Sequence, residues 1–135
     1  MYGWLVLARY VLRFAPFTLD GLARSAQKQY DYDLEGSRVP PRWGVSAFAG
    51  TPREGENVDL MVERICREAP ANGRQVAVGS ARDLEEAGYR LHDDEPPAGH
   101  VLIGDDELTQ GGDFDELARL WSSQRRRNPG FRKDG

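Results

Sequence analysis

Residues 89–107 have the sequence YRLHDDEPPAGHVLIGDDE, and this stretch decides how the sheet is expected to close. Two short runs, 89–92 and 100–104, flank a turn that contains two prolines and a glycine. Short runs on either side of such a turn are typical of a β-hairpin. The two histidines of the chain, His92 and His100, fall at the inner ends of these runs. The pattern therefore predicts that they flank the turn and lie opposite each other.

Before the hairpin, the pattern predicts strands that alternate with helices. Strands are expected at 4–14, 43–49 and 75–78, and helices at 18–34, at 57–69 and briefly after Ser80. The helix at 57–69 has the clearest pattern, because its apolar residues recur every three or four positions. After the hairpin, Asp113 is expected to cap a last helix, with Glu116 at the capping-box position.

The order β-α-β-α-β-α-β-β-α predicts the fold class. We expect an α/β or α+β single-domain sandwich with a mixed sheet of four to five strands. Residues 1–128 should form the single globular domain, because 135 residues are most simply one domain. Residues 129–135 follow a Pro-Gly stop and are expected to be a flexible C-terminal tail.

Composition indicates the cellular compartment of the protein and excludes some classes of partner. A net charge of −4 gives no general attraction to nucleic acid or to an anionic membrane. A single cysteine cannot form an internal disulfide, and no secretory signal or membrane-spanning run is evident. We therefore expect a cytoplasmic protein, and the strong preference for arginine over lysine suggests a bacterial source.

The hairpin carries the first set of candidate residues. His92 and His100, with Asp93 and Asp94, could bind a divalent metal or act as an acid and base pair. Glu107 follows the second strand and could act as a base or a ligand. The spacing of the histidines matches no zinc signature. The alternative is a solvated acidic turn whose histidines only mark its ends.

A second set of candidates could bind an anion. Arg9 and Arg13 should project from one face of the first strand, where they could hold a phosphate or a carboxylate. The alternative is that their stems pack on the sheet. Ser80 begins a helix, and is either an N-cap or part of an anion site.

A strand carrying arginine, a second strand with Ser46 and a later Glu107 are similar to the Arg-Ser-Glu arrangement of ADP-ribosyltransferase toxins. The resemblance covers these three scattered residues. It implies a toxin-like transferase as one alternative function.

For the C-terminal arginine run and for Cys66, the sequence pattern favours a structural role. The run Arg125–Arg127 suits the end of a helix, where cations meet the helix dipole, better than a nucleic-acid arm. Cys66 lies on the apolar stripe of its helix and is expected in the core.

The function expected from these patterns is that of a small interaction or accessory protein that acts through a protein partner. It would need no cofactor, could form a homo-oligomer, and could use Trp43, Tyr30 or Tyr32 as a contact patch. The alternative is a small enzyme, a metal-dependent hydrolase or a toxin-like transferase, with its site near residues 92–107.

Overall fold

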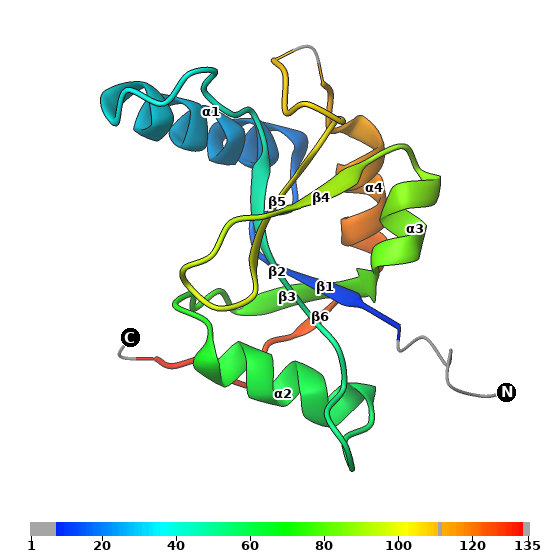
Figure 1. Cartoon of the computed structure of the whole chain (residues 1–135). Helices are drawn as coiled ribbons and strands as arrows, with labels where there is room; N and C mark the ends of the chain where they lie inside the picture. The colour runs from blue at the N-terminus through cyan, green and yellow to red at the C-terminus, as the bar shows by residue number, and fades with distance from the viewer. Residues whose placement is uncertain (1–7, 111, 134–135) are drawn as a thin grey trace, which may run out of the picture.

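A computed structural model describes residues 8–110 and 112–133, and these residues form six strands and four helices (Figure 1). In chain order the elements are β1 (Tyr10–Phe14), α1 (Leu19–Glu35), β2 (Val45–Gly50), α2 (Val58–Glu68), β3 (Gln75–Ser80), α3 (Ala81–Glu86), β4 (Arg90–Asp93), β5 (His100–Gly104), α4 (Asp115–Ser123) and β6 (Arg125–Arg127). The strands make one sheet in the order β4-β5-β2-β1-β3-β6, and every neighbouring pair is antiparallel.

Helices cover both faces of this sheet, with α2 on one side and α1, α3 and α4 on the other (Figure 1). The alternation of side chains along β1 divides the core between the two faces. Val11 packs with residues of α1, α3 and α4, whereas Leu12 packs against α2. Both side chains are fully buried. The apolar stripe of α2, which the sequence predicts, contributes Met61, Val62, Ile65 and the buried Cys66.

The α+β class is confirmed, but the expected mixed sheet of four to five strands is wrong. The alternation of strands and helices suggests parallel pairing only if each helix returns the chain to the end where the previous strand began. Here the loop at residues 36–44 lengthens the connection, so that β2 begins beside the end of β1. The first two strands are consequently antiparallel.

The C-terminal basic run also differs from its prediction. Helix α4 ends at Ser123, and Arg125–Arg127 form the edge strand β6, paired with Gln75–Ala77 of β3. All three arginine side chains are exposed, which suits charged residues to an edge position. The N-terminus of α4 differs as well, since Phe114 rather than Asp113 is its N-cap residue.

Both ends of the described chain bear on sequence predictions. The first strand begins at Tyr10, and residues 4–7 of the strand expected at 4–14 lie outside the described residues. After β6, the backbone of Arg132 exchanges two hydrogen bonds of 2.7 Å with the side chain of Asn72. The division into a domain at 1–128 and a flexible tail at 129–135 stays a prediction.

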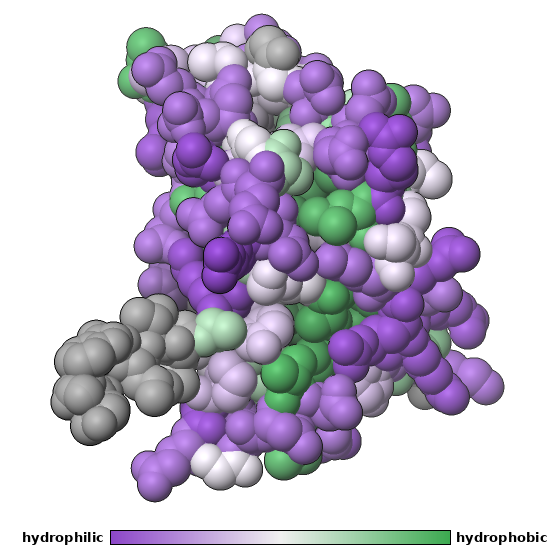
Figure 2. Space-filling model, turned by 90° about the vertical axis from the view of Figure 1, so that its right-hand side faces the viewer, coloured by the Kyte–Doolittle hydropathy of each residue, from purple (hydrophilic) through white to green (hydrophobic). Residues whose placement is uncertain are grey.

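The surface is largely hydrophilic on the face drawn in Figure 2, where apolar side chains gather in a band down the middle. Within the described ranges, no helix has both the length and the apolar character needed to cross a membrane.

Candidate functional site

Strands β1 and β2 separate halfway along their length. They pair from Tyr10 opposite Gly50 to Leu12 opposite Phe48, and no further. Beyond this point β1 continues to pair with β3 and β2 continues to pair with β5. Ser46 lies on β2 just past the last pair, where its main chain faces an open seam instead of a neighbouring strand.

Side chains take the place of the missing strand at Ser46. The N–H of Ser46 donates to Ser25 Oγ of α1 at 3.3 Å. The carbonyl oxygen of Ser46 accepts from Arg13 Nη1 at 2.8 Å. Buried main-chain groups are costly to leave unpaired, so these two contacts allow the seam to stay open inside the fold.

The side chain of Ser46 meets His100 of β5. The distance between Ser46 Oγ and His100 Nε2 is 2.6 Å. The register of β2 and β5 brings them together, because it pairs Phe48 with His100 and places Ser46 two residues away on the same face. The Phe48 ring packs edge-on against the imidazole, with 5.4 Å between the centroids, and helps to fix its orientation.

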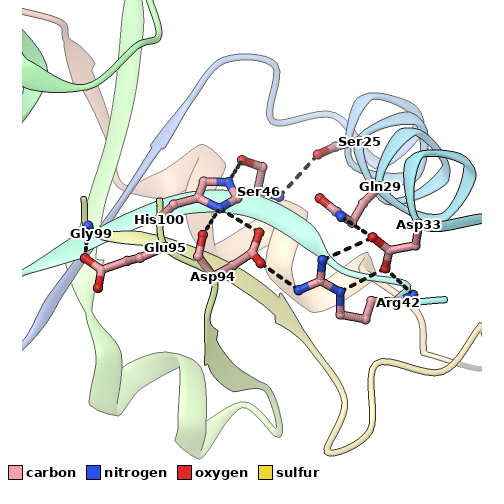
Figure 3. A network of polar contacts seen from close by, with 9 residues as sticks. All are labelled: Ser25, Gln29, Asp33, Arg42, Ser46, Asp94, Glu95, Gly99 and His100. Carbon is pink, nitrogen blue, oxygen red and sulfur yellow. Dashed lines mark hydrogen bonds and ion pairs between the residues drawn. The ribbon is translucent and has the colours of Figure 1, made fainter. Parts of the chain in front are cut away.

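Asp94 holds the other side of the imidazole (Figure 3). His100 Nδ1 lies 3.1 Å from both Asp94 Oδ2 and the carbonyl oxygen of Asp94. An ionised carboxylate and a carbonyl can only accept, so Nδ1 carries the proton and donates. In the neutral imidazole Nε2 then has a free lone pair and accepts from the Ser46 hydroxyl.

Arg42 holds Asp94 through the carboxylate oxygen that does not contact His100. Its Nη1 donates to Asp94 Oδ1 at 2.7 Å, while its Nε and Nη2 donate to the two oxygens of Asp33 at 2.8 and 3.1 Å. The Asp33 side chain is only 2% exposed and also accepts from Gln29. Ser46, His100 and Asp94 are therefore the outer end of a polar chain that reaches into the fold.

These contacts shift the pKa values of Asp33 and Arg42. Burial alone would raise the pKa of Asp33, but hydrogen bonds from the side chain and amide of Arg42 and from Gln29 hold that pKa below its usual range. The hydrogen bond to Asp33 raises the pKa of Arg42 in spite of burial. Both groups are charged at neutral pH, and Arg42 is a permanent cation behind Asp94.

Ser46 lies at the edge of a cavity. A cavity of about 600 Å³ lies between the end of β1, helix α1 and β2, and Ser46 is part of its lining. The His100 side chain is 13% exposed. A serine hydroxyl that donates to a histidine held by a carboxylate is the arrangement that activates serine as a nucleophile.

The structure separates the two histidines that the sequence groups together. The register places Leu102 opposite His92, and Asp94 donates its N–H to the carbonyl oxygen of His100. The histidines are therefore not opposite each other. His92 Nε2 lies 2.9 Å from the carbonyl oxygen of Asp105, a contact that ties the hairpin to the following loop.

The other predicted candidates lie apart from Ser46, except Arg13. Arg9 pairs with the exposed Asp93 at 2.8 Å. Ser80 caps α3 by accepting from the Asp83 N–H. The Glu107 carboxylate makes no hydrogen bond or ion pair with any other described residue, so the Arg-Ser-Glu likeness brings together only Arg13 and Ser46. Across residues 8–110 and 112–133, no group of three or more His, Cys, Asp or Glu side chains is placed to hold a metal ion.

Sequence reasoning missed Arg42 and Ser25, and it considered Ser46 only through the toxin likeness. One signal was available for Ser46, because it is the only hydroxyl-bearing residue in the otherwise apolar run at 43–49. No local signal pointed to Arg42, since its partners lie 9 and 52 residues away in the sequence.

Comparisons of the chain with models of protein families, with curated proteins and with solved structures find no match.

Proposed function

We propose that this protein is a serine-dependent hydrolase that acts on an ester, with Ser46 as nucleophile, His100 as general base and Asp94 as the residue that orients His100. The observation that carries the proposal is the pair of contacts on the His100 ring. Ser46 Oγ lies 2.6 Å from Nε2, and Asp94 Oδ2 lies 3.1 Å from Nδ1. These distances fit the reach expected of a nucleophile, its base and the group that orients the base.

The reaction would run in two steps. His100 Nε2 takes the Ser46 proton while Oγ bonds to the ester carbonyl carbon, and the imidazolium then protonates the departing alcohol. Water next attacks the acyl-serine, with His100 as base, and releases the acid and free Ser46. In both steps Asp94 stabilises the imidazolium without itself taking the proton.

Arg42 would act as a positioning residue in this mechanism. It holds the Asp94 carboxylate in place through a hydrogen bond of 2.7 Å, and it makes no hydrogen bond with Ser46 or His100.

A fluorophosphonate probe tests the proposal directly. An activated serine displaces fluoride from the probe, forms a covalent Ser–O–P bond and adds the phosphonyl mass to the protein. We expect wild-type protein to be labelled at Ser46, and Ser46→Ala and His100→Gln to remain unlabelled. Ser123→Ala is the matched control, because Ser123 is an exposed serine that bonds only to its own helix. Labelling that persists in Ser46→Ala would overturn the proposal.

A protein-binding role is the second candidate, and exposed apolar residues at and after the end of α1 support it. Tyr32 is 72% exposed, Val39 is 87% exposed, and Leu34 is also exposed. Trp43 and Tyr30 instead pack edge-on against each other and are half-buried. Affinity capture with wild type and with a Tyr32→Ser/Val39→Ser double variant tests this role. It predicts a partner that the wild type retains and the double variant loses.

A further inference from the structure

The cavity beside Ser46 has an unusual balance of charge for this acidic chain. Its lining includes Arg13, Arg24 and Lys28 but only one carboxylate, that of Asp31. The whole chain, in contrast, has a net charge of −4. Asp31 already accepts a hydrogen bond from Gln27 at 2.9 Å. The cavity is therefore a local positive region, and such a region concentrates anions.

Arg13 is the most informative of these cations. Its side chain is only 8% exposed, and it donates to two carbonyl oxygens, those of Ser46 and Pro16. In the described part of the chain, no carboxylate lies within ion-pair distance of it. Buried charges are usually paired. Burial without such a partner lowers the pKa of Arg13 to about 10, a cost that a bound anion would relieve.

Arg24 and Lys28 extend the positive region along α1. They lie four residues apart, so they share one side of the helix. Both are exposed, and neither makes a hydrogen bond or ion pair with another of the residues that the structure describes. Their donors are available to a ligand that enters the cavity, whose volume suits a small organic molecule.

We propose that this cavity binds a negatively charged group, a carboxylate or a phosphate, on the substrate whose ester bond Ser46 attacks. The inference rests on the proposed function for the place of the ester, and it adds the substrate class. The Arg13 guanidinium would hold the anion near the base of the seam, with Arg24 and Lys28 at its outer side. The alternative is that Arg13 only satisfies the Ser46 carbonyl oxygen, in which case the cavity has no preference for anions.

Two esters of matched size separate these alternatives. Monomethyl succinate carries an ester and a carboxylate, and methyl butyrate has the same number of carbons without the charge. NMR titration of the Ser46→Ala variant measures binding of each without turnover. We expect monomethyl succinate to bind at least about tenfold more tightly, as a charge-assisted contact allows. Equal affinity for the two esters would overturn the proposal.

Variants locate the binding to this cavity. Arg13→Met and Arg24→Gln, each combined with Ser46→Ala, should reduce the preference for monomethyl succinate. Arg82→Gln is the control, because Arg82 is an exposed helical arginine on α3, outside the cavity lining. If Arg13→Met does not fold, Arg24→Gln still decides, since its side chain is exposed. A preference that survives both cavity variants would contradict the assignment.

Titrations of the Ser46→Ala variant with inorganic phosphate and with succinate identify the anion. Together with the labelling experiment, they also keep the two proposals apart. Tighter binding of inorganic phosphate than of succinate would assign a phosphate-bearing substrate, and the reverse a carboxylate-bearing one. Anion binding without labelling of Ser46 would overturn the hydrolase but support the anion site. Labelling of Ser46 without any preference for monomethyl succinate would overturn the anion site and leave the hydrolase standing.

Discussion

Between Tyr10 and Leu12 the seam between β1 and β2 is closed by strand pairing, whereas past Leu12 side chains hold it open. In the closed half, main-chain groups pair with one another and the buried Leu12 packs against α2. In the open half, the main chain of Ser46 bonds to Ser25 and Arg13. The same two strands thus provide apolar packing at one end and polar residues that line a cavity at the other.

A seam that is paired at one end and open at the other shows where a small sheet can place polar groups beside a cavity. A fully paired strand has no room for a ligand beside it, because its neighbours lie about 5 Å away on each side. Where two strands part, the gap can admit a ligand, but each unpaired main-chain group then needs another partner. Arg13 and Ser25 meet that need here, and both also line the cavity.

The largest effect we expect comes from Ser46→Ala in the open half. Ester hydrolysis should fall by about 10³-fold or more, as when a catalytic serine is removed. The free energy of unfolding should fall by only about 1 kcal/mol, since one hydrogen bond is lost. Turnover of a chromogenic ester and urea unfolding measure the two effects. Equal turnover in the two proteins would remove the proposed chemistry from this site.

The next largest effect should come from Arg42→Met, behind the open half. The change leaves Asp33 buried without its cation, which should cost about 3–5 kcal/mol of stability. Urea unfolding measures the loss. The Asp33→Asn/Arg42→Met double variant should recover part of it, because no buried charge remains. A double variant less stable than Arg42→Met would mean that the ion pair is not the source of the cost.

In the closed half, Leu12→Ala should destabilise the fold by about 2–5 kcal/mol, through lost burial and the cavity that it leaves. Leu12→Met, which keeps the volume, should cost less than about 1.5 kcal/mol. Both folded variants should still be labelled at Ser46 by the fluorophosphonate. Loss of labelling in folded Leu12→Met would show that the two halves of the seam are coupled.

The smallest effect is on the pH dependence of stability. It arises from Asp33, which is joined to the open half of the seam through Arg42 and Asp94. Because the pKa of Asp33 is lower in the folded chain than in the unfolded one, its contribution to stability is complete above the unfolded value of about 4 and is lost as pH falls through the folded value. The stability difference between wild type and Asp33→Asn should therefore shrink as the pH falls below about 4. Urea unfolding across this range measures it, and a constant difference would contradict the shift.

The sequence predicted the elements far better than it predicted the site. Helix α2 follows from apolar periodicity and strand β5 from a short run beside a turn, and both signals depend on neighbours a few residues apart. The pairing of Ser46 with His100 depends on two strands 54 residues apart, and no local pattern encodes that register. Asp94 and His100 are close in sequence, and this proximity alone makes them candidates. Their further partners, Arg42 and Ser46, lie 52 and 54 residues away in the chain.

Strand β6 was missed for a related reason. Three successive arginines have little preference for a strand, and only the edge of β3 gives them that conformation.

The same strand limits how the molecule can meet copies of itself. An outermost strand offers unpaired main-chain groups to any other chain, and joining of such edges is a common start of aggregation. Two copies that approached through β6 would bring Arg125, Arg126 and Arg127 of each against the same residues of the other. Arg126 is paired with Asp59 at 3.1 Å, but the guanidinium groups of Arg125 and Arg127 would repel those of the second copy and so disfavour association through this edge.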